Sequence, residues 1–261
     1  MIDGLEWGIL GPALLAGLLV LAIHVPLGQE VLRRGIIFID LAIAQIAGLG
    51  VISAHSFGLA PDGLAVQLIA AGSAMLGALL LSWSERRWRD GQEALIGVIF
   101  VLAAVTGLLM LAHNPQGGEH LQALLSGQIL WVDIHWLPWV ALLYGVLLAL
   151  WLGLGRRIGD VGFYLIFSLA VTASVQLVGV YLVFSSLIIP ALATWRKGLT
   201  GTRRLLAGYT IGAAGYAGGL LASTLTDLPS GPVIVWALAV AGILFQMIGG
   251  NTRVRGLLSP D

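Results

Sequence analysis

The uncharged run from Gly162 to Trp195 most limits how this chain can fold. One membrane crossing by a helix takes about 20 apolar residues and two take about 40, so the run is too long for one crossing and short for two. Gln176, Gly179 and Pro190 interrupt it. We expect one full helix, a break near Gln176–Gly179, and a shorter returning segment that ends at a cationic surface. Such a break must pack against protein or line a cavity, and broken helices mark substrate pathways in several transporters.

The composition places the whole chain in a membrane. Hydrophobic residues make up 58% of the sequence and charged residues only 10%. A soluble domain of 261 residues could not bury that much apolar surface. We therefore expect an all-α, polytopic membrane helical bundle that forms a single domain over residues 1–261, surrounded by the lipid bilayer. The absence of cysteine excludes disulfides, thiolate metal ligands and cysteine nucleophiles.

The positions of the cations predict the topology. If the first run enters from outside and the central stretch crosses and returns, all 13 Lys and Arg residues face one side. The positive-inside rule then predicts an outside N-terminus, a cytoplasmic C-terminus and eight or nine segments. The apolar runs fall at about 7–25, 36–54, 64–83, 95–112, 137–154, 163–178, 179–195, 205–224 and 233–249.

One of these runs carries a stripe of small residues. Glycines recur in it every three or four positions, at Gly208, Gly212, Gly215 and Gly219. Small residues on one helix face allow another helix to approach closely in lipid. The partner is either a helix of the same chain or a second copy in a homodimer, and the sequence leaves both open.

Asp40 is the only acidic residue inside an apolar run. An ionisable group at that depth is costly and is by default a candidate functional residue. The structural alternative is that Asp40 pairs with Arg33 and only orders the helix entrance. Gln45 lies about 140° around an ideal helix from Asp40, so a site that uses both needs a second helix or a bend.

The sequence lacks the motifs of several enzyme activities. No GxxxxGK[ST] phosphate-binding loop is present, and neither is an HExxH or GxSxG motif. We therefore expect a transport protein and not an enzyme, with no permanently bound cofactor, no nucleic-acid partner, and any ATP hydrolysis on another chain. The segment Ala191–Arg204 carries four cations after the broken stretch. It is either an amphipathic helix that contacts a soluble partner or an ordinary cytoplasmic loop.

Four segments together resemble a known family. VQLVGVYLVFSSLIIPALAT (Val175–Thr194) resembles the hallmark stretch of the ABC-3 family of metal-ion ABC transporter permeases. VPLGQEVLRRGIIFIDLAIAQ (Val25–Gln45), EALIGVIFVLA (Glu93–Ala103) and TDLPSGPVIV (Thr226–Val235) resemble further family segments, in the family's order and spacing. The resemblance covers essentially the whole chain.

The resemblance implies a permease of the bacterial plasma (inner) membrane. Such a permease dimerises, binds cytoplasmic ATPase subunits that carry the ATP, and receives zinc or manganese from an extracytoplasmic metal-binding protein. The ion crosses a dimeric pore by alternating access. Asp40 matches the family's aspartate, which is proposed to contact the ion in transit, and Gln45 lies beside the same pathway. The implied contacts with the ATPase are Ala191, Thr194, Trp195, Arg196 and Lys197.

One position departs from the family pattern. The family has a histidine four residues after the aspartate, and this chain has Ala44. Zn²⁺ favours imidazole, whereas Mn²⁺ accepts carboxylates and carbonyls, so the change weakens the case for zinc. The alternative function is a stand-alone secondary cation transporter that uses Asp40. Against it stand the single buried carboxylate and the absence of a clear inverted repeat.

Overall fold

The chain is an all-helical bundle, as predicted. The computed structural model describes residues 7–59, 63–112, 122, 125–195 and 199–255, and none of these lies in a strand. Eight helical segments in the described part are long and apolar enough to cross a membrane. The helices are α1 (Trp7–Arg34), α2 (Ile39–Ser56), α3 (Leu64–Arg87), α4 (Gln92–Leu111), α6 (Leu137–Val178), α7 (Val180–Trp195), α8 (Gly201–Thr226) and α9 (Ser230–Arg255), with short 3₁₀ turns η1 (Arg89–Gly91) and η2 (Ile129–Trp131).

Helix α6 holds two spans that fold back on each other. Its 42 residues would extend about 63 Å if straight. The Tyr144 and Ser174 hydroxyl oxygens nevertheless lie 2.6 Å apart, although a straight helix would separate these residues by about 45 Å. The reversal occurs around Gly159, whose φ of 65° is the left-handed conformation that glycine adopts at no steric cost. The two arms correspond to the candidate spans Leu137–Leu154 and Gly159–Val178.

The predicted break lies at Gly179. Helix α6 ends at Val178, Gly179 has φ 84°, and the 16-residue α7 follows directly. The backbone of Gly179 packs against the backbone of Gly127 in the preceding connection. The break is therefore packed against protein, as lipid requires of irregular backbone. It does not extend to Pro190, because α7 continues through that residue to Trp195.

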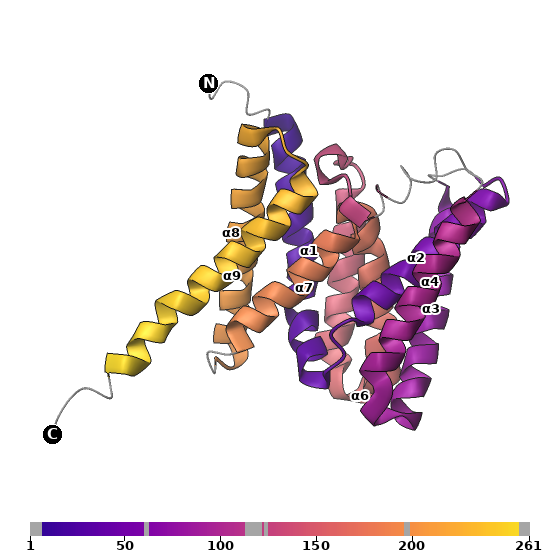
Figure 1. Cartoon of the computed structure of the whole chain (residues 1–261), viewed down its shortest axis with the longest axis horizontal. Coiled ribbons are helices and arrows are strands. Elements are labelled where there is room, and N and C mark those ends of the chain that lie inside the picture. Colours follow the sequence, from indigo (N-terminus) through magenta and orange to yellow (C-terminus); the bar gives the residue numbers. More distant parts are fainter. Residues whose placement is uncertain (1–6, 60–62, 113–121, 123–124, 196–198, 256–261) are drawn as a thin grey trace.

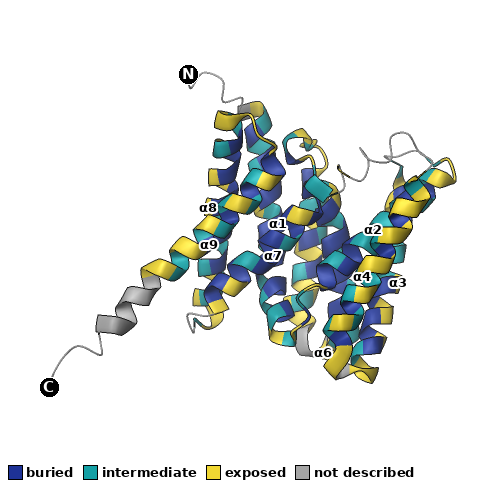
Figure 2. Cartoon of the chain, in the orientation of Figure 1, coloured by how far each residue is buried: buried dark blue, intermediate teal, exposed yellow. Residues whose placement is uncertain are grey.

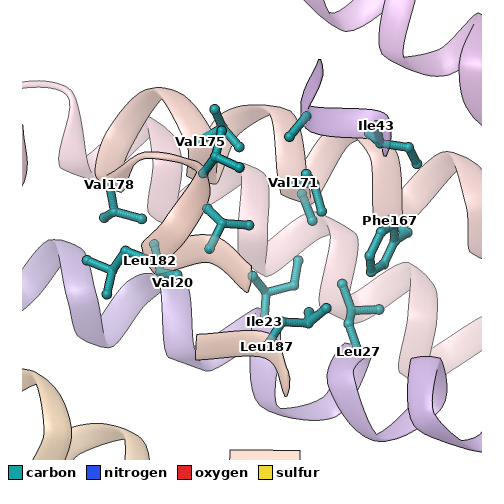
Figure 3. Packing of buried hydrophobic residues seen from close by; sticks show 14 of the residues in the cluster. Val20, Ile23, Leu27, Ile43, Phe167, Val171, Val175, Val178, Leu182 and Leu187 are labelled. Carbon is teal, nitrogen blue, oxygen red and sulfur yellow. The ribbon is translucent and has the colours of Figure 1, made fainter. Parts of the chain in front are cut away.

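The helices form two groups joined by α6 and α7. In the first group α2 packs on α3 and α4; in the second α8 packs on α9, and α8 also contacts the central α1. Figure 1 shows the first group on the right and the second on the left, with α1, α6 and α7 between them. The buried core lies along this central region, and Figure 3 shows how α1, α6 and α7 meet there. Its labelled residues are Val20, Ile23, Leu27, Ile43, Phe167, Val171, Val175, Val178, Leu182 and Leu187.

The outward faces are apolar and exposed. Leu76 on α3 and Met247 on α9 are about two-thirds exposed, and Figure 2 shows such exposed residues along the outer helices. In water this would be an unusual surface, whereas in a bilayer it is the face presented to lipid.

The glycine stripe of α8 packs within the chain. An added Cβ at Gly212 would overlap the side chain of Leu21 on α1, and one at Gly219 would overlap the backbone and side chain of Ile234 on α9. Gly208 and Gly215 likewise face α1 and α9. The intrachain alternative of the sequence analysis is therefore the one that the structure shows.

Candidate functional site

Asp40 lies in the first turn of α2, just after a tight turn. Helix α1 ends at Arg34, Gly35 takes φ 72°, and α2 begins at Ile39. The Asp40 side chain is buried, at 1% exposure. Neither carboxylate oxygen has a hydrogen-bond partner in the part of the chain that the structure describes. The N-terminal end of a helix favours a nearby negative charge, but a buried carboxylate without a partner remains costly.

The alternative role for Asp40, pairing with Arg33, does not occur. Arg33 instead binds Glu30 one turn earlier on α1, with its Nε donating to Glu30 Oε2 at 2.8 Å. Asp40 is thus not neutralised by the nearby Arg33. A carboxylate held in this way can take part in binding a cation.

The structure places a second carboxylate beside the same turn. Glu93 lies in the first turn of α4, and its Oε1 accepts a hydrogen bond from the backbone N–H of Phe38 at 3.2 Å. Its Oε2 has no partner among the described residues. The carboxylate of Glu93 therefore contacts the chain two residues before Asp40. The sequence analysis did not single out Glu93, which precedes its apolar run, and the only signal was its place at the start of the EALIGVIFVLA segment.

Gln45 and Ala44 face a small cavity near the break. The cavity has a volume of about 20 Å³ and lies between α2, α4 and the α6–α7 junction. Val175 and Val180 line it from either side of Gly179. It is large enough for about one water molecule. Asp40 is not among its lining residues. The structure therefore brings Gln45 to the break, whereas Asp40 lies in the first turn of α2, two residues after the Phe38 N–H that binds Glu93.

The other predicted pathway residues lie apart from this cavity. Gln176 is exposed on the surface of α6, and Gly179 is buried. Pro190 lies within α7 near Gly208 of α8. Among the residues that the structure describes, no three His, Asp or Glu side chains gather into a cluster that could hold a metal ion. The described residues thus offer two carboxylates near the α1–α2 turn, Asp40 on α2 and Glu93 on α4.

The residues implied in ATPase coupling divide into buried and exposed ones. Ala191 and Thr194 are fully buried, and the Thr194 hydroxyl donates to the carbonyl of Pro190 at 2.9 Å. Trp195 is 39% exposed, and the guanidinium of Arg204 lies 4.8 Å from its ring. Arg196 and Lys197 lie outside the described residues. Of the described residues in that set, only Trp195 offers a surface to another protein.

The model of the ABC 3 transport family matches residues 6–157 and 136–249, which together span nearly the whole sequence. This chain belongs to the ABC 3 transport family. The match covers both the α1–α2 turn with Asp40 and the α6–α7 break. It confirms the family predicted from the four sequence segments.

Known relatives agree with this assignment. The manganese transport system membrane protein MntC of Bacillus subtilis is 28% identical over 253 residues, covering 87% of this chain and 58% of that protein. This chain thus spans a little over half the length of that relative.

Solved structures share the fold. A structure described as PsaBC from Streptococcus pneumoniae in complex with Fab superposes with a TM-score of 0.76, at 20% identity and with 99% of this chain and 98% of that chain covered. An inward-facing conformation of a putative metal-chelate type ABC transporter gives a TM-score of 0.64, at 18% identity, covering 97% and 88%. At these identities the likeness shows the fold of this ABC 3 family chain.

Proposed function

We propose that this chain is the membrane permease subunit of an ATP-driven importer of divalent metal ions. The observation that carries the proposal is the buried Asp40 carboxylate, left without a partner at the start of a membrane helix in an ABC 3 family chain. An intramembrane carboxylate lowers the cost of moving a cation through a medium of low dielectric. A relative named as a manganese transport system membrane protein supports a metal as cargo.

The donor atoms at the site favour Mn²⁺ over Zn²⁺. Asp40 and Glu93 both supply carboxylate oxygen, and Ala44 leaves no imidazole on the same helix face one turn after Asp40. Carboxylate, carbonyl and water oxygens suit Mn²⁺, whereas Zn²⁺ gains more from nitrogen or sulfur ligands. The amide of Gln45 at the neighbouring cavity adds a further neutral oxygen along the path.

The transport step needs partners that this chain does not supply. In the proposed assembly two copies form the pore, an extracytoplasmic metal-binding protein delivers the ion, and cytoplasmic ATPase subunits bind ATP and drive alternating access. The sequence contains no phosphate-binding loop of its own. The C-terminal end of α7 at Trp195, with the cations that follow it, contacts the ATPase. The N-terminus faces outward and the C-terminus lies in the cytoplasm of the bacterial cell.

Uptake of radioactive Mn²⁺ by cells expressing the whole transporter tests this function. We expect Asp40→Asn to abolish uptake while the protein still assembles in the membrane, because the neutral amide cannot compensate the ion's charge. Asp133→Asn is the control, since Asp133 is exposed and its side chain accepts a hydrogen bond from the backbone N–H of His135, which an amide oxygen can also accept.

Uptake at the wild-type rate in Asp40→Asn would contradict the role given to Asp40. Uptake that survives depletion of ATP while an ion gradient remains would instead support a secondary transporter.

A further inference from the structure

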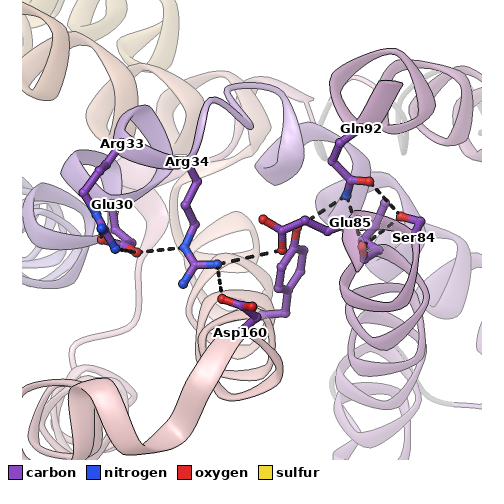
Figure 4. Close-up of polar contacts among 9 residues, drawn as sticks. Glu30, Arg33, Arg34, Ser84, Glu85, Gln92 and Asp160 are labelled. Carbon is purple, nitrogen blue, oxygen red and sulfur yellow. Dashed lines mark hydrogen bonds and ion pairs between the residues drawn. The ribbon is translucent and has the colours of Figure 1, made fainter. Parts of the chain in front are cut away.

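Arg34 joins three helices at the end of α1. Its Nε donates to Glu30 at 2.7 Å, and its Nη1 lies 2.8 Å from Asp160 on α6 and 3.8 Å from Glu85 on α3. Its guanidinium carbon also lies 4.3 Å from the ring centre of Phe163. Figure 4 shows the side chain of Arg34 reaching between these carboxylates. The Arg34 side chain is 14% exposed, so water screens these ion pairs less than it screens pairs at the surface.

A second set of contacts links the start of α4, where Glu93 lies, to two of these helices, α3 and α6. Gln92, its neighbour, donates through Nε2 to the Leu81 carbonyl at 3.0 Å and to the Tyr164 hydroxyl at 3.4 Å. The Ser84 hydroxyl donates to Gln92 Oε1 at 2.9 Å. Gln92 is buried. The start of α4 is therefore attached to the last turns of α3 and to the first turns of the second arm of α6.

These two sets of contacts meet at the Asp40 turn. Only five residues separate Arg34 from Asp40. The N–H of Gly35 closes the end of α1 by donating to the Val31 carbonyl at 3.0 Å. At the other end of the turn, the N–H of Phe38 donates to Glu93. Both carboxylates of the candidate site are thus held, through short covalent links, by helices that Arg34 connects.

We propose that Arg34 is a positioning residue for the cation site that Asp40 and Glu93 form. This inference rests on the proposed function. Arg34 makes no contact with Asp40 in the ion pairs described, and it acts by fixing the ends of α1, α3 and α6 relative to one another. Outer-shell residues that orient metal ligands typically contribute about 10- to 100-fold to metal affinity.

The neighbouring arginine provides a matched control. Arg33 has the same charge and sits one residue earlier, but its side chain is 66% exposed and its ion pair is with Glu30, on its own helix. Removing Arg33 changes the net charge as much as removing Arg34 does. It leaves the link between α1, α3 and α6 in place.

The test is Mn²⁺ binding to the purified full-length chain. Binding is measured as the loss of the free Mn²⁺ signal in electron paramagnetic resonance. We expect Arg34→Ala to weaken binding by about 10-fold or more and Arg34→Lys by less, because lysine keeps the charge but not the planar donor fork. Arg33→Ala should stay within about twofold of wild type, because the Arg33 side chain is largely exposed and Glu30 keeps its ion pair with Arg34. Thermal unfolding, measured in parallel, identifies variants that are folded at the binding temperature.

Each result of these measurements either supports or overturns the positioning role of Arg34. If folded Arg34→Ala binds Mn²⁺ as wild type does, Arg34 is only structural and the proposal fails. If that variant does not fold, Asp160→Asn and Glu85→Gln each remove one carboxylate from Arg34, and wild-type affinity in both would overturn the proposal. If the wild-type chain and Asp40→Asn bind equally poorly, the site itself is absent and the proposed function of Asp40 falls with it.

Discussion

At the scale of single residues, the Asp40 carboxylate is the main candidate functional group of this chain. A buried carboxylate without a partner costs several kcal/mol unless something compensates its charge. Its neighbours on α1, Arg33 and Arg34, bind Glu30 and other carboxylates instead. The fold therefore provides cations within a few residues of Asp40 and pairs them elsewhere. That arrangement is what the proposed role of Asp40 in holding and releasing a passing ion requires.

Ala44 offers a direct test of ion selectivity. We expect Ala44→His to favour Zn²⁺, because it places an imidazole one helical turn after Asp40 on the same face. The Zn²⁺ concentration that displaces half of the bound Mn²⁺ should fall by about tenfold or more, equivalent to roughly 1.4 kcal/mol. Competition can be followed by the return of the free Mn²⁺ resonance.

Ala44→Gln is the matching control, since it adds similar bulk to the wall of the same cavity without an imidazole. An equal shift in Ala44→Gln and Ala44→His would mean that crowding, and not the ligand, changed the selectivity.

The helices of this chain pack closely where small residues permit it. Helix α8 carries its glycines toward α1 and α9, and the space they leave is filled by side chains such as Leu21 and Leu238. In lipid, where burying apolar surface gives little advantage, this close contact supplies much of the association between helices. The same argument applies at the α6–α7 break, where Gly127 and Gly179 meet backbone to backbone.

Two glycines of α8 make this argument testable. Gly212 faces Leu21, whereas Gly218 has no atom within 4 Å of an added Cβ and is exposed. We expect Gly212→Ala to destabilise the protein by about 1–3 kcal/mol, because the added methyl group forces α1 and α8 apart. Gly218→Ala should be neutral or stabilising by up to about 1 kcal/mol, through helix propensity alone.

Thermal unfolding of both variants in the same detergent measures the difference. Equal stability of Gly212→Ala and Gly218→Ala would show that the α1–α8 contact tolerates the larger residue, contrary to the packing seen here.

At the scale of the whole molecule, the ion pairs around Arg34 lie at one end of the bundle. The ends of α1 and α3 meet there with the reversal that follows the first arm of α6, where Arg34 contacts Glu85 and Asp160. These are the helix ends that the positive-inside rule predicts to face the cytoplasm. The exposed tryptophans Trp131, Trp136 and Trp139 flank the first turn of α6, at the opposite end of that arm. They have the position of an interfacial aromatic belt.

The natural absence of cysteine allows this orientation to be measured with single cysteine variants. We expect a membrane-impermeant thiol reagent to label Asp133→Cys in intact spheroplasts and to leave Arg86→Cys unlabelled, because both positions are exposed but lie at opposite ends. Inside-out vesicles should give the reverse pattern. Labelling of Arg86→Cys from outside would require the opposite topology.

Much of the fold followed from the sequence alone. The number of spans, the all-helical class, the break at Gly179 and the family all depend on properties of short segments: apolar length, the position of glycine, and ordered motifs. Asp40 stood out for the same reason, because a single carboxylate in an apolar run is visible without any partner. These features depend on residues that are close in sequence. The free energy of placing each short segment in the bilayer determines them.

Tertiary structure alone decided which distant residues meet. Arg33 lies close to Asp40 in sequence, yet it forms its ion pair with Glu30. Arg34 forms ion pairs with Glu85 and Asp160, which lie on other helices. Glu93 became part of the candidate site only because α4 packs beside the α1–α2 turn. The burial of the α8 glycines and the exposure of Gln176 likewise depend on which helix lies opposite each residue. Pairings between helices far apart in sequence come from packing the whole bundle, and no single segment contains the free energy that selects them.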